Sequence, residues 1–211
     1  MEKNVVIGHE PRFQSAYAVC ASSLGYDVNV HSTPNDLIVR QQDGSTSFTY
    51  SRFLIPWMMK YNGWSLFCDC DFLFLEDVGE LFKLADDQFA VMVCMHPEYT
   101  PKTLVKMDNK TQTTYPRKNW SSLILWNNRH PKNSILTPEF VNKQSPDVLH
   151  GFRWLKDKDI GSIPLEWNTL VGYYQFNNPK ALHYTDGTPN LPGYSSCEYA
   201  DLWWKEYNKI C

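Results

Sequence analysis

Short apolar runs alternate with amphipathic segments along this chain. The stretch "DVNVHS" alternates apolar and polar residues as a strand does, whereas "FQSAYAVCASSL" has helical spacing and is followed by Gly25. Strands that alternate with helices predict an α/β domain with a mixed, mostly parallel central sheet flanked by helices. Strands are predicted at 4–7, 27–32, 64–74, 89–95, 121–127 and 179–185, an extended piece at 36–42, and helices at 13–24, 51–63, 77–85 and 195–210.

Two parts of the chain have a weaker pattern. Residues 96–119 are rich in Pro, Lys and Thr and are predicted to form a long surface loop. Residues 130–180 hold only short apolar pieces between prolines and glycines. The last predicted helix is amphipathic, with Ser195 or Ser196 as its cap. Because no repeat and no second-domain boundary is visible, residues 1–211 are predicted to form a single domain.

The composition excludes several classes of protein. The chain has 211 residues, 43% apolar and 20% charged, and a formal net charge of −3, which is ordinary for a globular protein. No polybasic run occurs, so nucleic acid is not expected as a partner. No apolar run reaches the roughly 18–20 residues of a membrane span. The aromatic share of 15% fits either a sugar- or base-binding surface or an aromatic core.

The N-terminal apolar stretch is too short for a signal peptide. We therefore expect a soluble, cytoplasmic protein in which the six cysteines are reduced thiols. In that compartment the glycosylation sequons at Asn109 and Asn119 carry no meaning.

Two carboxylates lie in one of the most apolar parts of the chain, "WSLFCDCDFLF". In a continuous strand, Asp69 and Asp71 point to the same side of the sheet, at the end where ligands bind in open α/β sheets. Two like charges this close repel unless a cation lies between them or one carboxyl is protonated. A hard divalent ion such as Mn²⁺ or Mg²⁺, itself binding ligand phosphates, relieves the repulsion. The alternative is a capped strand end, and the same pattern at Asp157–Asp159 is interpreted as a solvated loop.

Two enzyme classes place Asp-x-Asp after an apolar strand. In haloacid-dehalogenase-like phosphatases the first Asp is a nucleophile, and the motif stands near the N-terminus with Thr or Val two residues after the second Asp. Here that residue is Leu73, and a strand–helix–strand unit precedes the motif. In nucleotide-sugar glycosyltransferases the motif follows the nucleotide-binding half, as it does in this chain.

Along nearly its whole length the sequence resembles the GT-A glycosyltransferases, and most closely the family-8-like branch with its short bacterial and virus-encoded members. The likeness rests on six segments in the family's order. They are "VVIGHEPRFQSAYAVCASSL", "SRFLIPWMM" with "GWSLFCDCDFLF", "WSSLILWN", "SPDVLH", "IPLEWNTL" and "LHYTDGTPN". The resemblance implies a nucleotide-binding half at 1–95 and a half at 96–211 that binds the donor sugar and the acceptor.

The chain also departs from the family pattern. Gly187 follows His183 by four residues rather than three, and the Lys that contacts the diphosphate in the family is absent from that segment. Val148 and His150 replace a Gln and an Asn beside the reacting centre. The stretch "PRKN" at 116–119 either supplies the missing positive charge or is a solvated loop.

The resemblance also implies roles for individual residues. His183 completes the metal site with Asp69 and Asp71, unless it is only a hydrogen-bonded structural residue. Arg52 holds the diphosphate or forms a salt bridge, and Asp147 acts at the anomeric carbon or caps a helix. The remaining substrate-binding residues that we expect are Gly8, His9, Arg12, Cys70, Trp126, Asn127, His150, Trp167 and Asn168.

The expected activity is transfer of a sugar from a nucleotide-diphosphate sugar, with UDP implied by the resemblance, to a hydroxyl of a glycan or glycoprotein acceptor. The resemblance also implies retention of the anomeric configuration and Mn²⁺ or Mg²⁺ as cofactor. A sugar nucleotidyltransferase fits poorly, because "GHEPR" is neither Gly-rich nor strongly basic. A phosphatase and a carbohydrate-binding protein without activity remain alternatives.

Overall fold

The computed structural model describes residues 2–40, 44–97, 105–106, 110–111 and 117–210. Its centre is a six-stranded sheet with the strand order β2-β1-β3-β8-β5-β9. The strands are β1 (Asn4–Ile7), β2 (Asn29–Ser32), β3 (Trp64–Cys68), β5 (Val91–Cys94), β8 (Leu123–Asn127) and β9 (Ile160–Ile163). The predicted α/β fold class is therefore confirmed.

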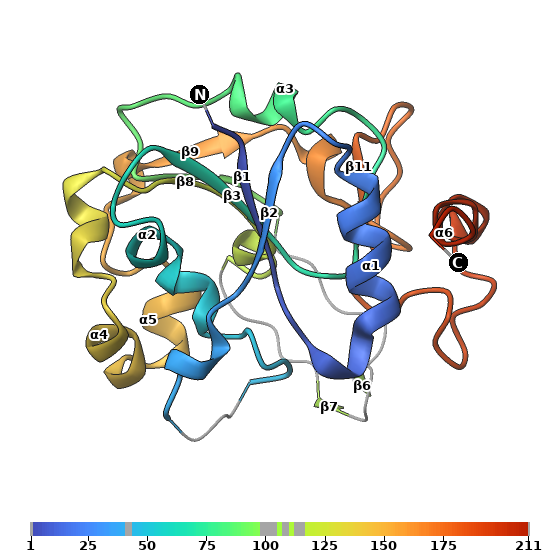
Figure 1. The fold of residues 1–211 in the computed structure, drawn as a ribbon, viewed down its shortest axis with the longest axis horizontal. Coiled ribbons are helices and arrows are strands. Elements are labelled where there is room, and N and C mark those ends of the chain that lie inside the picture. Colours follow the sequence, from blue (N-terminus) through green and yellow to red (C-terminus); the bar gives the residue numbers. More distant parts are fainter. Residues whose placement is uncertain (1, 41–43, 98–104, 107–109, 112–116, 211) are drawn as a thin grey trace.

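One strand of this sheet runs against the others. The pairs β1–β2, β1–β3 and β5–β9 are parallel, whereas β8 is antiparallel to both β3 and β5. Five strands consequently end at one edge of the sheet, and only β8 begins there. In Figure 1, β1 runs from the top of the view toward the bottom, and α1 returns upward beside the sheet. This common carboxyl edge is where open α/β sheets bind ligands.

Two smaller sheets complete the strand arrangement. The strands β10 (Thr169–Leu170), β11 (Ala181–His183) and β4 (Phe72–Phe74) form one sheet, in which β11 is parallel to β10 and antiparallel to β4. The strands β6 (Val105–Lys106) and β7 (Lys110–Thr111) form a two-stranded antiparallel sheet. The pairing of β4 with β11 brings His183 next to the residues that follow β3.

Helices lie around the central sheet (Figure 1). They are α1 (Gln14–Ser23), α2 (Ile55–Met58), α3 (Gly79–Phe82), α4 (Pro138–Lys143), α5 (Pro146–His150) and α6 (Ala200–Tyr207). Helix α1 packs against both β4 and α6, and Ser22 of α1 donates a 2.7 Å hydrogen bond to Glu206 of α6. No helix in the described ranges is long and apolar enough to cross a membrane.

Several predicted elements differ from the observed ones. The run 64–74 is two strands of different sheets joined by a turn. The predicted extended piece at 36–42 overlaps a 3-10 turn at Asn35–Leu37, and its last two residues lie outside the described part of the chain. The predicted helix 51–63 is a 3-10 turn followed by the short α2, and it stops before Lys60 and Tyr61, which have positive φ angles. The last helix begins after Tyr199, not at Ser195 or Ser196. The range 130–180, predicted as irregular, contains α4, α5, β9 and β10.

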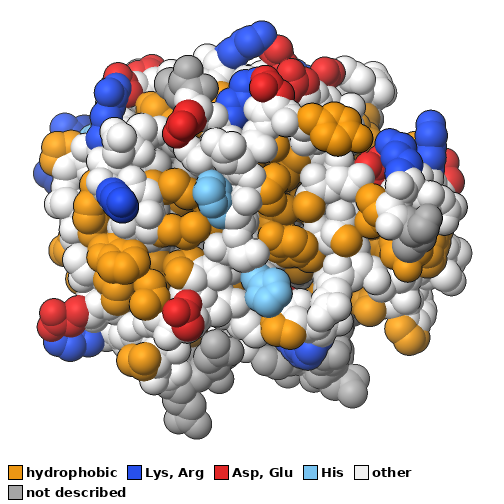
Figure 2. Space-filling model, viewed as in Figure 1, with side chains coloured by type: hydrophobic (Ala, Val, Ile, Leu, Met, Phe, Trp, Pro, Cys, Tyr) orange, Lys and Arg blue, Asp and Glu red, His pale blue; other side chains and the backbone are white. Residues whose placement is uncertain are grey.

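The aromatic residues mostly form the core. Among the largest fully buried side chains are Trp126, Trp167, Trp203, Tyr50 and Tyr184. Because these rings are inside, packing accounts for a large part of the aromatic content. On the face in Figure 2, Lys and Arg are scattered, mostly toward the margins, and they form no continuous basic area on that face.

Candidate metal centre

The aspartate pair lies on the turn between β3 and β4, at the carboxyl edge of the central sheet. The N–H of Asp69 donates to the carbonyl of Ser122 at 2.9 Å, and the carbonyl of Asp71 accepts from the N–H of Tyr184 at 2.9 Å. The first bond holds the turn to the start of β8, and the second holds it to the end of β11. The predicted continuous strand through the motif is therefore wrong, but the turn still directs both carboxylates to one place.

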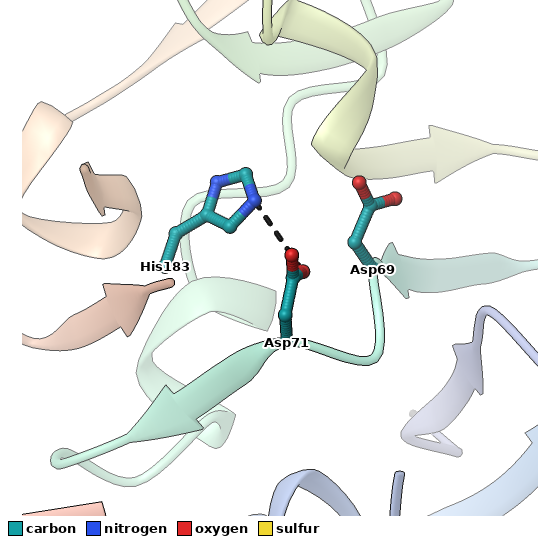
Figure 3. Close-up of side chains that lie close together, drawn as sticks. All are labelled: Asp69, Asp71 and His183. Atoms are coloured by element: carbon teal, nitrogen blue, oxygen red, sulfur yellow. Dashed lines mark ion pairs between the residues drawn. The ribbon is translucent and has the colours of Figure 1, made fainter. Parts of the chain in front are cut away.

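Asp69, Asp71 and His183 converge although His183 is far away in the sequence (Figure 3). One ligand atom from each of the three side chains lies within 4.8 Å of the others. The Nε2 atom of His183 is 3.4 Å from Oδ1 of Asp71. The side chains of Asp69, Asp71 and His183 are 18%, 14% and 2% exposed, so the cluster is mostly enclosed.

This donor set fits a divalent cation. Carboxylates suit Mg²⁺, Ca²⁺ and Mn²⁺, and an imidazole suits transition metals such as Zn²⁺ and Fe²⁺. Ligand atoms about 2.2 Å from one ion lie at most about 4.4 Å apart. The three ligand atoms lie within 4.8 Å of one another, which is close to that limit. The predicted group Asp69, Asp71 and His183 is thus a possible metal site.

Arg52 is buried behind the cluster. Its Nη1 atom donates to Oδ1 of Asp69 at 2.7 Å and to the carbonyl of Ser121 at 2.8 Å, and its Nε donates to the carbonyl of Thr49 at 3.2 Å. Its guanidinium also lies over the rings of Phe48 and Phe67. Arg52 forms its salt bridge with the first aspartate of the motif and not with a surface carboxylate, and its role at the diphosphate stays a prediction.

A pocket opens beside the three candidate ligands. Its walls come from five parts of the chain: the segment that begins α1, the segment from Ser45 to Arg52, the turn between β3 and β4, the segment before β8, and the end of β11 with the residues after it. The lining residues are Phe13, Ala16, Ser45, Thr46, Phe48, Arg52, Asp69, Cys70, Asp71, Asn119, His183, Thr185 and Thr188. The lining combines the apolar side chains of Phe13, Ala16 and Phe48 with carboxylates and hydroxyl groups, which suits a ligand with an apolar part and a charged part.

Arg12 is not among the residues that line the pocket, and Glu10 holds it against the loop that begins at Ser45. Its Nε donates to Oε1 of Glu10 at 2.8 Å, and its Nη2 donates to Oε2 at 3.0 Å and to the carbonyl of Ser45 at 3.0 Å. Glu10 also accepts from the N–H of Ser47 at 2.8 Å. Burial disfavours the charged form of Glu10, but these hydrogen bonds outweigh it and hold its pKa at about 2. The pair thereby anchors the loop that forms one pocket wall.

Gly8 and His9 follow β1 but do not line the pocket. A Cβ on Gly8 would lie 2.6 Å from the ring of Phe48, so the absence of a side chain serves packing and not ligand approach. The N–H of His9 donates to Oγ1 of Thr33, and its carbonyl accepts from Asn35. These contacts connect the carboxyl ends of β1 and β2.

Other predicted substrate-binding residues are buried or make hydrogen bonds inside the protein. Cys70 lines the pocket but is only 3% exposed, and burial raises the pKa of its thiol. His150 shares a 2.8 Å hydrogen bond with the hydroxyl of Ser121. Trp167 is a core residue. Asn168 is fully buried, and its Oδ1 lies 2.9 Å from Nδ1 of His183. The five cysteines in the described residues are free thiols.

Three further predicted residues, Trp126, Asn127 and Asp147, lie away from the cluster. Because β8 is antiparallel, Trp126 and Asn127 pair with Ser65 and Trp64 at the opposite edge of the sheet. Asp147 lies on α5 with a side chain that is 63% exposed and ion-paired with Arg153. The structure gives this carboxylate no contact with the pocket or with the metal group.

Sequence reasoning missed most of the pocket wall. The residues it did not name as part of the site are Phe13, Ala16, Ser45, Thr46, Phe48, Asn119, Thr185 and Thr188. Apolar and hydroxyl side chains give no chemical signal in a sequence, so most of these could not be found. Thr185 and Thr188 were accessible to reasoning, because they directly follow the predicted ligand His183.

Comparison with known proteins places this geometry in context. No family model matches the chain. Protein CDI of Arabidopsis thaliana is 46% identical over 226 residues, which cover 97% of this chain and 87% of that protein.

Among solved structures, the WbbM bifunctional glycosyltransferase superposes with a TM-score of 0.68 at 14% identity. The match covers 98% of this chain and 49% of WbbM, so the chain spans about half the length of that protein. The galactosyltransferase LgtC, solved with donor and acceptor sugar analogues, superposes with a TM-score of 0.58 at 10% identity, over 98% of this chain and 95% of LgtC. At such identities the likeness shows the fold, which is that of the GT-A glycosyltransferases and includes the family-8 type.

Proposed function

Because the chain belongs to the family of Arabidopsis Protein CDI and has the GT-A fold, we propose that it is a metal-dependent glycosyltransferase. Its donor is a nucleotide-diphosphate sugar, with UDP as the carrier, and its acceptor is a hydroxyl group of a glycan or glycoprotein. The observation that carries the proposal is the convergence of Asp69, Asp71 and His183 beside a pocket at the carboxyl edge of the sheet.

The charges of the site support a diphosphate ligand. Asp69, Asp71 and the buried guanidinium of Arg52 together carry a formal charge of −1. A divalent cation changes this sum to +1, which attracts the negatively charged diphosphate. Without the cation the two carboxylates would repel that group. Nucleotide binding is therefore proposed to depend on the metal.

Different residues of the chain have different roles in the proposed reaction. Asp69, Asp71 and His183 would hold Mn²⁺, which when bound stabilises negative charge on the leaving diphosphate. Arg52 holds Asp69 in place by a 2.7 Å ion pair. Arg12 and Glu10 hold the loop at 45–48, whose Ser45, Thr46 and Phe48 line the pocket together with Phe13. We assign the nucleoside to that part of the pocket, within the proposed nucleotide-binding half at 1–95.

UDP as carrier and retention of configuration follow from the likeness to family 8. LgtC is a galactosyltransferase of that type and was solved with analogues of its donor and acceptor sugars. The segment that provides a diphosphate-contacting Lys in the family has Thr188, Pro189 and Asn190 here. Thr185 and Thr188 line the pocket at that position, so hydroxyl groups are proposed to face the diphosphate where the family has an ammonium group.

The alternative functions have less support. A haloacid-dehalogenase-like phosphatase uses its first aspartate as a nucleophile, but the matching fold here is GT-A and Asp69 is bound by Arg52. A carbohydrate-binding protein built on surface aromatic residues would need them outside, and Trp126, Trp167 and Trp203 are buried.

Thermal unfolding of the purified chain tests the proposal. UDP, GDP, CDP and dTDP are each added with and without Mn²⁺, because a ligand that binds only the folded state raises the unfolding midpoint. A rise with UDP that requires Mn²⁺ is expected, followed by slow hydrolysis of UDP-sugars. No rise with any nucleotide would refute the proposal.

A further inference from the structure

A chain of buried polar groups runs from His183 to the backbone of the segment that precedes β8. Nδ1 of His183 lies 2.9 Å from Oδ1 of Asn168, and Nδ2 of Asn168 donates to Oγ of Ser122 at 2.9 Å. The hydroxyl of Ser122 donates to the carbonyl of Asn119 at 2.7 Å. The four residues are 2%, 0%, 3% and 8% exposed, so bulk water does not compete with these bonds.

The donor and the acceptor of each hydrogen bond in this series follow from the carbonyl of Asn119. The carbonyl of Asn119 can only accept a hydrogen bond, so the hydroxyl of Ser122 must donate to it. The lone pairs of Ser122 then accept from the amide nitrogen of Asn168, which turns the amide oxygen of Asn168 toward His183. An amide oxygen can only accept, so Nδ1 of His183 must carry a proton.

A proton on Nδ1 leaves the lone pair of the neutral imidazole on Nε2. Nε2 is the atom that faces Oδ1 of Asp71 at 3.4 Å. We propose that Ser122 and Asn168 are positioning residues, which select the tautomer of His183 that can bind a divalent cation. This inference rests on the proposed metal site, and it assigns to two residues outside that site a defined role in it.

Ser122 has a second contact with the same site. Its backbone carbonyl accepts the N–H of Asp69 at 2.9 Å, and the carbonyl of its neighbour Ser121 accepts from Arg52, which also binds Asp69. The start of β8 therefore positions two of the three candidate ligands, one through the backbone and one through Asn168. Side-chain variants of Ser122 remove only the second of these effects.

Alternative arrangements of the same residues would not serve a metal. If the amide of Asn168 were reversed, its NH₂ group would face Nδ1 of His183, which would then have to accept. The proton of the neutral ring would move to Nε2 and occupy the position of the metal bond. Removal of the Ser122 hydroxyl makes this reversal possible, whereas a carboxylate at position 168 prevents it because both of its oxygens accept.

A double-mutant cycle of four proteins tests the inference. The Mn²⁺ affinity of each protein is measured by electron paramagnetic resonance without nucleotide. The four proteins are the wild type, Ser122→Ala, Asn168→Asp and the double variant. Loss of a second-shell partner typically costs 10- to 100-fold in metal affinity. We expect Ser122→Ala to bind Mn²⁺ at least about 10-fold more weakly, and Asn168→Asp to bind it about as tightly as the wild type. The double variant should also bind like the wild type, and thermal unfolding confirms that each protein is folded.

Two results of the cycle would overturn the inference. The first is wild-type affinity in Ser122→Ala. The second is a double variant as weak as Ser122→Ala while Asn168→Asp alone binds normally, because Ser122 would then act by a route other than the amide of Asn168. A purely structural role for Ser122 predicts equal losses in both backgrounds.

A second measurement does not depend on the metal. Nitrogen-15 spectra of protein with labelled histidine report which ring nitrogen of neutral His183 is protonated, and a His183→Gln variant identifies its signals. We expect the proton on Nδ1 in the wild type and a mixture of tautomers in Ser122→Ala. If the wild type does not bind Mn²⁺ but shows this tautomer, the proposed function fails and the inference about the ring stands. A proton on Nε2 in the neutral wild-type ring overturns the inference whatever the metal result.

Discussion

The anchor formed by Glu10 and Arg12 leads to a quantitative prediction about stability. Glu10 is 2% exposed and accepts hydrogen bonds from Arg12 and Ser47. Lowering its pKa from 4.5 to about 2 corresponds to about 3 kcal/mol of stability at neutral pH. Arg12 is 45% exposed, so solvent screens part of this interaction, and we expect Glu10→Gln to cost about 2 kcal/mol.

The sign of the pH dependence follows from the lowered pKa of Glu10. A carboxyl whose pKa is depressed in the folded state contributes its full stability above its unfolded pKa of about 4.5. The contribution is then lost as the pH falls through the folded pKa of about 2. The difference between wild type and Glu10→Gln should therefore be constant above about pH 5, and roughly half or less of it should remain near pH 3.

Urea unfolding of both proteins at several pH values measures this difference. At neutral pH the unfolding temperature of Glu10→Gln should be about 4–8 °C lower. Glu139→Gln is the control, because Glu139 forms an ion pair with Lys143 on the surface and is 79% exposed, so no measurable change is expected. A stability difference for Glu10→Gln that stays the same from pH 7 to pH 3 would refute the electrostatic explanation.

Three further predictions concern other residues. Burial lowers the pKa of His96 to about 3, and the charge of His183 makes a smaller contribution in the same direction. The folded protein should therefore lose stability as the pH falls from about 6.5 toward about 3, and a pH series of urea midpoints should show a shallower loss for His96→Phe. Gly8→Ala should cost about 1–3 kcal/mol because its Cβ meets the ring of Phe48, and adding Phe48→Leu should recover part of it. An equally stable Gly8→Ala protein would contradict that packing argument. Asp147→Asn should bind UDP with Mn²⁺ like the wild type in a titration, since Asp147 is exposed and paired with Arg153; a large loss would place Asp147 in the site after all.

The metal group was largely predictable from the sequence, whereas the path of the chain through it was not. Two carboxylates close together after an apolar strand repel each other, and a bound cation relieves this repulsion. That argument needs only the sequence. The turn at 69–71 depends on the bonds of Asp69 to Ser122 and of Asp71 to Tyr184. Both partners are far away in the sequence, so no local pattern reports them.

The antiparallel direction of β8 explains why two predicted site residues, Trp126 and Asn127, lie at the other edge of the sheet. An apolar run such as 121–127 has the same pattern whether the strand is parallel or antiparallel to its neighbours. The likeness to a strand that lines the donor sugar placed Trp126 and Asn127 at the site. The antiparallel pairing places Ser121 and Ser122 there instead.

Two helices that were not predicted, α4 and α5, have recognisable start signals in the sequence. Thr137 and Ser145 each precede a proline and cap the helices α4 and α5, with Pro138 and Pro146 in the first turn. Ser or Thr followed by Pro is a recognised helix start. The range 130–180 could therefore have been assigned two helices from its sequence.

The central claim is that Asp69, Asp71 and His183 hold a cation that in turn holds a nucleotide diphosphate. Calorimetric titration of UDP, with and without Mn²⁺, into the wild type and Asp71→Ala tests it most directly. Asp157→Ala is the matched control, because Asp157 belongs to the second Asp-x-Asp pattern and is 92% exposed. The account predicts UDP binding that requires Mn²⁺ in the wild type and in Asp157→Ala, and its loss in a folded Asp71→Ala protein. UDP binding that is equal with and without Mn²⁺, or that survives in Asp71→Ala, would contradict it.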